Sequence, residues 1–119
     1  MTQTTEPFIK RVIIESPYAG DVERNLRYVR AIMRDCLLRG EAPFASHLFY
    51  TQGVLDDNIP HERELGMRAG WAWLEVAHEI AVYEDLGISP GMDAAIKHFL
   101  SLGRGQPVVM RRLPGILLP

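Results

Sequence analysis

Residues suited to holding a small anion gather where a predicted strand gives way to a helix. Ser89, Pro90 and Gly91 follow a short apolar run and precede an amphipathic segment. Serine is a favoured N-cap, proline suits the first helical position, and glycine lets a ligand approach the backbone. The free N–H groups at a helix start attract anions. We expect Ser89, Gly91 and Met92 to bind an anion, although the same residues also suit a capped junction that binds nothing.

Other candidate ligand contacts follow each of the predicted strands. They are Ser16, Tyr18 and Gly20 after the first strand, His47 in the second and Asp85 after the third. Because parallel strands end at one edge of a sheet, we expect these residues to surround one pocket. Tyr18 suits stacking on a flat ring. His47 is suited to hydrogen-bond to a ligand. A histidine with no ligand role is equally expected at the end of a strand.

The elements that position these residues alternate regularly along the chain. Short apolar runs predict strands, and apolar residues at helical spacing predict helices. The sequence predicts strands over residues 8–15, 42–48, 79–83 and 107–112, and helices over residues 22–39, 61–76 and 90–102. This order is typical of a parallel sheet with right-handed crossovers. We expect an α/β fold of the Rossmann-like or flavodoxin-like type, a three-layer sandwich around a parallel sheet of four or five strands.

The length of the chain, 119 residues, suits one domain with a modest core. We expect a single domain over residues 1–119, with a loose tail over residues 1–7 and an apolar tail over residues 114–119. Residues 49–60 lack periodicity and predict a long loop, which is often functional. The paired arginines Arg111 and Arg112 are expected to face solvent at the end of the last strand.

Composition argues against several classes of function. The formal net charge of −2 offers no basic surplus for a nucleic-acid polymer. Cys36 is the only cysteine, so it is expected to be a buried structural thiol, and no multi-cysteine metal site is possible. No histidine pair has metal-ligand spacing, and no apolar run approaches the roughly 20 residues of a membrane span. We expect no metal, no cofactor, no membrane contact and a cytoplasmic location.

Four short motifs in a fixed order resemble a known superfamily. They are S-P-Y-A-G-D, P-F-A-S-H-L, E-I-A-V-Y-E-D-L-G-I-S-P-G-M and Q-P-V-V-M-R-R. Together, over about Lys10 to Leu113, they resemble the nucleoside 2-deoxyribosyltransferase-like superfamily. The nearest resemblance is to its small, uncharacterised phage and bacterial members.

That resemblance implies a nucleoside or nucleotide as the ligand. It implies that the loop from Tyr18 to Gly20 lines the base and sugar pocket and that Ser89 to Met92 hold the sugar end or the 5′-phosphate. It also implies that Asp85 contacts the sugar. In the superfamily a glutamate one turn into this helix attacks the anomeric carbon, but here that position holds Ala95. The chemistry needs a carboxylate, because an anion stabilises or captures the oxocarbenium-like sugar.

Two main functions remain open at this point. The first is an enzyme, a nucleotide N-glycosidase or deoxyribosyltransferase, in which Asp85 is the surviving catalytic carboxylate. The second is a protein that has lost the nucleophile at Ala95 and senses or sequesters a nucleotide. A structural or protein-interaction role is a weaker third possibility, suggested by the apolar helix and the apolar tail.

An apolar helix and an apolar tail predict at least a homodimer. Leu65, Trp71 and Leu74 lie in the helix, and Ile116, Leu117 and Leu118 lie in the tail. A small domain has difficulty covering all of these side chains alone, and exposed apolar patches usually mark contacts.

Overall fold

The computed structural model describes residues 8–115 of the chain. The predicted tail over residues 1–7 and the apolar residues Ile116, Leu117 and Leu118 lie outside the described part. Along the chain the elements are β1 (Arg11–Glu15), α1 (Val22–Leu38), β2 (Ala42–Phe44), α2 (Ser46–Phe49), α3 (Pro60–Leu74), β3 (Glu79–Tyr83), α4 (Pro90–Ser101) and β4 (Val108–Arg111). None of the helices in this part is long and apolar enough to cross a membrane.

The four strands form one all-parallel sheet in the order β2-β1-β3-β4. This confirms the predicted α/β class and the flavodoxin-like arrangement. In the register, Ile13 lies beside Phe44 of β2 and Ile80 of β3, and Ile80 lies beside Val108 of β4. After β1 the chain crosses toward one edge of the sheet, and after β3 it crosses toward the other. The gap between the ends of β1 and β3 is therefore the switch point, where ligands of such sheets bind.

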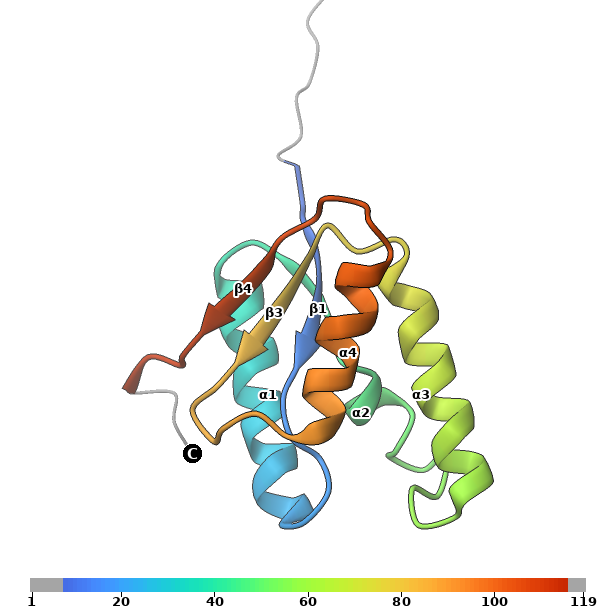
Figure 1. Ribbon diagram of the computed structural model, residues 1–119. Helices are drawn as coiled ribbons and strands as arrows, with labels where there is room; N and C mark the ends of the chain where they lie inside the picture. The colour runs from blue at the N-terminus through green and yellow to red at the C-terminus, as the bar shows by residue number, and fades with distance from the viewer. Residues whose placement is uncertain (1–7, 116–119) are drawn as a thin grey trace, which may run out of the picture.

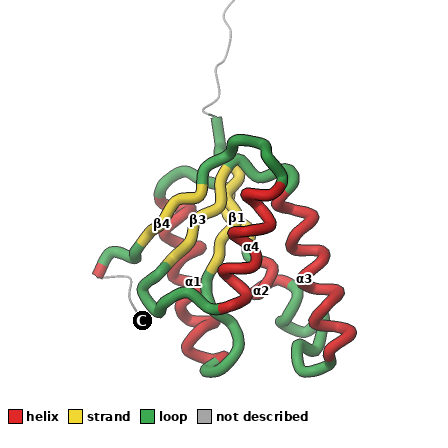
Figure 2. Tube along the Cα trace, in the orientation of Figure 1, coloured by secondary structure: helices red, strands yellow, loops and turns green. Residues whose placement is uncertain are grey.

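Helices cover both faces of the sheet, which confirms the predicted three layers. Figure 1 shows α1 behind the strands and α4 in front of them, and Figure 2 shows the strands between these helices. On one face a core cluster joins Val12 and Ile14 of β1 to Tyr28, Val29 and Ile32 of α1. On the other face a second cluster contains Ile13, Ile80, Leu74 and Phe99. The alternation of side chains along β1 thus serves two cores.

The second predicted strand is shorter than expected. β2 ends at Phe44, and α2 begins at Ser46, where a strand to residue 48 was predicted. The N–H groups of Leu48 and Phe49 donate to the carbonyl of Ala45 at 3.1 and 3.0 Å, which closes a helical turn. A helix of four residues has no periodicity that a sequence pattern could reveal.

Helix α3 covers less of the core than its apolar sequence suggested. Of its residues only Gly70 and Leu74 are buried, while Leu65 and Trp73 are each 45% exposed. Figure 1 shows why: α3 lies beside α4 at the margin of the domain. The exposed side chains suit a contact with a second subunit, and the homodimer stays a prediction.

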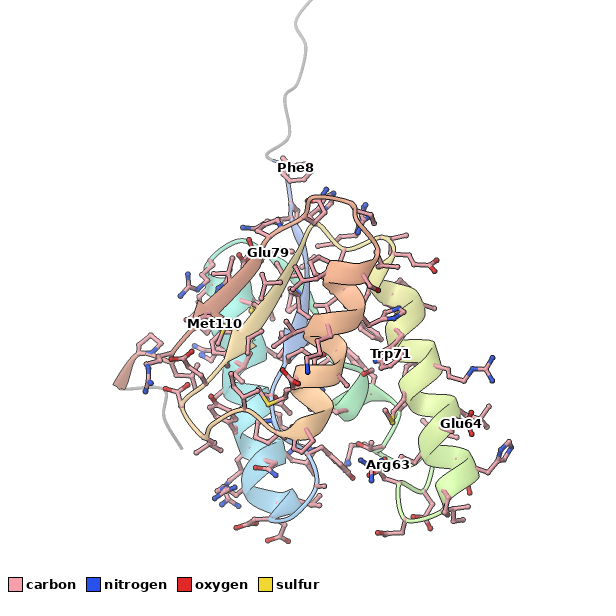
Figure 3. All side chains as sticks on the ribbon, in the orientation of Figure 1. Phe8, Arg63, Glu64, Trp71, Glu79 and Met110 are labelled. Atoms are coloured by element: carbon pink, nitrogen blue, oxygen red, sulfur yellow. The ribbon has the colours of Figure 1, made fainter. Side chains whose placement is uncertain are left out.

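The expectation that Arg111 faces solvent is wrong. Its guanidinium is buried on the α1 face of the sheet, where Nη1 and Nη2 each donate to the Glu41 carboxylate at 2.7 Å. Nη2 also donates to Glu79 at 2.7 Å, and Lys10 donates to Glu79 at 2.9 Å. Burial alone would raise the pKa of Glu41, but Arg111 and Lys10 outweigh it and hold that pKa below its ordinary value. Glu79 lies at the amino end of β3 (Figure 3).

Replacing Arg111 should cost far more stability than replacing its neighbour. Arg111→Met leaves two buried carboxylates without their main partner, and we expect a loss of about 3–5 kcal/mol in the free energy of unfolding. Arg112 is exposed and pairs with Glu84 at 3.1 Å, so Arg112→Met should cost less than about 1 kcal/mol. Urea denaturation of both variants measures the difference, and equal losses would contradict the assignment of Arg111 to the core.

Candidate functional site

A cavity of about 390 Å³ opens at the end of β1, between the sheet, helices α2 and α3 and the start of α4. Its volume lies in the range of small-molecule sites, about 300–1,000 Å³. β1 and the loop after it contribute Ile13, Glu15, Ser16, Tyr18 and Ala19, and α4 contributes Ser89, Pro90, Gly91, Met92 and Ala95. The remaining lining comes from Ser46, His47, Tyr50, Thr51, Leu55 and Asp57 around α2, and from Glu62, Arg63, Gly66, Met67, Gly70, Trp71 and Leu74 of α3.

Most of the residues predicted to contact a ligand meet at this cavity. Ser16, Tyr18, His47, Ser89, Gly91 and Met92 all line it, whereas Gly20 and Asp85 do not. The convergence follows from the parallel topology, because all of these residues come after strands that run the same way. Their roles in binding stay predictions.

Gly20 lies in a polar hollow next to the cavity, about 610 Å³ in volume, which shares Tyr18 and Ala19 with it. Its φ angle of +98° lies in the left-handed region that favours glycine, so Gly20 shapes the turn into α1. The buried amide of Asn25 holds this loop, since its Nδ2 donates to the carbonyls of Tyr18 at 2.8 Å and Ala19 at 3.1 Å. Sequence reasoning did not single out Asn25.

Asp85 takes part in contacts that hold the fold together. Its carboxylate accepts hydrogen bonds from the Tyr28 hydroxyl at 2.6 Å and from the Leu113 N–H at 3.1 Å. Its own N–H donates to the Tyr28 oxygen at 3.0 Å. These bonds tie the end of β3 to α1 and to the segment after β4. The geometry thus favours a structural role for Asp85, and its catalytic role stays a prediction.

The start of α4 is capped as the sequence suggested and keeps donors toward the cavity. The Ser89 hydroxyl oxygen accepts from the Met92 N–H at 3.3 Å, and the Ser89 N–H donates to the Met92 sulfur at 3.3 Å. Within residues 8–115, the Gly91 N–H makes no hydrogen bond. A Cβ atom at Gly91 would meet nothing nearer than the Ser89 Oγ at 3.9 Å. The backbone here is therefore open to a ligand.

A short hydrogen bond of 2.6 Å joins Ser16 Oγ to His47 Nε2 at the cavity wall. Burial lowers the pKa of His47 to about 4, so its imidazole is neutral at pH 7. Among the described residues, no carboxylate hydrogen-bonds to the other ring nitrogen of His47. The pair therefore lacks the third member of a catalytic triad. Its clearest effect is to fix α2 against the end of β1.

Glu15 is a cavity residue that sequence reasoning did not single out. It is the last residue of β1, and the strand alternation places its side chain on the same face as Ile13, toward α4. In the part of the chain that the structure describes, its carboxyl group makes no hydrogen bond and no ion pair. Burial raises the pKa of Glu15 to about 8. A glutamate that ends an otherwise apolar strand was the available signal.

Helix α2, which carries His47, packs very closely on α3. A Cβ atom at Gly70 of α3 would lie 2.5 Å from Ser46 Oγ and 2.7 Å from Ser46 Cβ, so only glycine fits there. The Trp71 ring of α3 stacks on His98 of α4 with centroids 4.4 Å apart. Figure 3 shows Trp71 between these two helices. The cavity wall is thus built from direct contacts between α2, α3 and α4.

Metal ligands do not cluster in this site. Across the described range, no group of three or more histidine, cysteine, aspartate or glutamate residues is placed to hold a metal ion.

Comparison with known proteins identifies the family of the chain but no activity. Residues 10–109 match the family described as "Domain of unknown function (DUF7768)", so the chain belongs to that family. No curated protein matches the sequence.

A methyl group at Gly70 should disturb the contact between α2 and α3. Gly70→Ala gains about 1 kcal/mol of helix propensity, but the overlap with Ser46 should cost about 1–3 kcal/mol and move α2. Gly66→Ala is the matched control, because its Cβ would lie 3.3 Å from the flexible end of Leu55. Thermal unfolding should show Gly70→Ala as the less stable variant. The reverse order would contradict the close packing.

The half-buried side chain of Glu15 should make stability depend on pH. Its pKa rises from 4.5 to about 8 on folding. The stabilising contribution of protonated Glu15 to the free energy of unfolding is therefore complete below pH 4.5 and is lost as the pH rises through 8. Glu15→Gln stays neutral throughout, so it should stabilise the protein most at pH 8–9 relative to the parent. Urea denaturation at a series of pH values measures this, with Glu84→Gln as the control. A benefit that does not grow with pH would contradict the raised pKa of Glu15.

Proposed function

We propose that this member of the DUF7768 family binds a nucleoside or nucleotide in the cavity and cleaves the bond between base and sugar. The observation that carries the proposal is the meeting of three groups at one cavity: a flat aromatic ring, a helix start and a carboxyl group. They come from Tyr18, from Ser89 to Met92, and from Glu15. A nucleotide offers a matching base, phosphate and glycosidic bond.

The position of the cavity supports a ligand of this class. It lies at the switch point of a parallel sheet, where nucleotides are commonly bound in α/β proteins. The parallel sheet is also compatible with the nucleoside 2-deoxyribosyltransferase-like superfamily, whose motifs the sequence resembles.

Recognition would divide between the two sides of the cavity. The ring of Tyr18 stacks on the base. The Gly91 N–H and the Ser89 hydroxyl donate to the 5′-phosphate at the positive end of the α4 dipole. Arg63 is the cationic side chain of the lining and adds a favourable charge near the mouth, which it shares with the polar hollow.

A protein that binds a nucleotide without cleaving it is the second candidate. Ala95 favours it, because this residue lines the cavity at the position where the superfamily carries its nucleophilic glutamate. Such a protein would sense or sequester the nucleotide. One experiment separates the two functions: a panel of nucleosides and nucleoside monophosphates is tested for binding by thermal shift and for release of free base by chromatography.

Gly91→Leu should abolish nucleotide binding and leave the fold intact. The larger side chain fills the open space beside the Gly91 N–H. Among the described residues, no atom lies nearer to its Cβ atom than the Ser89 Oγ at 3.9 Å. Gly115→Leu is the matched control, since Gly115 also has open space and lies outside the cavity. Titration calorimetry with the tightest-binding nucleotide measures the effect. Binding by Gly91→Leu at the affinity of the parent would place the anion site elsewhere.

A further inference from the structure

We propose that Glu15 is the catalytic acid of this cavity and that it protonates the departing base. The inference rests on the proposed function and names the residue that performs its chemistry. It differs from the sequence-based expectation, which placed the catalytic carboxylate at Asp85.

Depth within the site distinguishes Glu15 from the other acidic residues of the cavity. Asp57 and Glu62 line both the cavity and the open polar hollow beside it, so they lie at the mouth. Glu62 also accepts a hydrogen bond from the Asp56 N–H at 3.1 Å. Glu15 lines the cavity but not the polar hollow. Helix α4 brings no acidic residue to the cavity.

The surroundings of Glu15 keep a proton on its carboxyl group. The other titratable side chains that line the cavity are Tyr18, His47, Tyr50, Asp57, Glu62 and Arg63. Across residues 8–115, none of them makes a hydrogen bond or an ion pair with Glu15. The imidazole of His47 is neutral at pH 7 and is engaged by Ser16 at 2.6 Å. A half-buried carboxyl group without a positive partner retains its proton more readily, which agrees with the pKa of about 8.

A protonated carboxyl group can act directly on a glycosidic bond. The Glu15 O–H donates its proton to a nitrogen of the base while the bond from C1′ to the base breaks and its electron pair moves onto the base. Water then adds to the oxocarbenium-like C1′ and gives up a proton to the Glu15 carboxylate. One water is consumed, the products are the free base and the sugar or sugar phosphate, and Glu15 returns to its starting form.

The experiment compares three variants with the parent protein. Glu15→Gln keeps the size of the side chain and removes the acid, and Glu15→Asp keeps the acid on a shorter arm. Glu84→Gln is the matched control, since Glu84 follows β3 and pairs with Arg112 outside the cavity. Each protein is incubated with the panel of nucleosides and nucleoside monophosphates, base release is followed by chromatography, and binding is measured by calorimetry.

We expect Glu15→Gln to lower kcat by about 10²–10⁴-fold while it binds the nucleotide as the parent does. Glu15→Asp should retain part of the activity, and Glu84→Gln should match the parent. The rate of the parent should fall as the pH rises through about 8, because the acid form is lost there. The residual rate of Glu15→Gln should not fall over this pH range. If the role of Glu15 were only structural, the variant would show the same fall as the parent.

Three results would overturn the inference, and they separate it from the proposed function. Cleavage by Glu15→Gln at the rate of the parent would show that another group is the acid. If the parent binds a nucleotide but releases no base, the protein senses or sequesters the nucleotide, and Glu15 has no catalytic role. Failure of every nucleotide to bind the parent would overturn the proposed function together with this inference.

Discussion

The buried guanidinium of Arg111 connects the two edges of the sheet. Arg111 belongs to β4 at one edge, and its bidentate partner Glu41 directly precedes β2 at the other. Glu79 of β3 and Lys10 before β1 complete the cluster, so every strand is linked to it. Breaking such a cluster leaves charges buried without partners, which is costly. The cluster therefore fixes the arrangement of the strands on which the cavity depends.

The contrast between Glu41 and Glu15 shows how one fold gives the same residue type two environments. Glu41 has a buried arginine as its partner, and its pKa is lowered. Glu15 lies at the ends of the strands in a cavity without a cationic partner, and burial raises its pKa to about 8. A charge satisfied by its neighbours stabilises a structure, whereas an unpaired acid at a cavity is a candidate for chemistry.

Much of the fold could be predicted from local patterns, and most of what was missed depends on contacts between distant residues. The strand Glu79–Tyr83 and the helix start at Ser89 have the predicted bounds, because apolar runs and capping residues act over a few positions. Arg111 looked like a surface residue because Glu41 lies 70 positions away in the sequence. Glu15 looked like an ordinary strand end, since only the packing of α2, α3 and α4 encloses it.

A crystal structure of Glu15→Gln with a bound nucleoside monophosphate tests the account most directly. We expect the base beside Tyr18, the phosphate at the Gly91 N–H, and the glycosidic bond within hydrogen-bond reach of residue 15. A nucleotide bound outside the cavity, or in it with the glycosidic bond away from residue 15, would contradict the account.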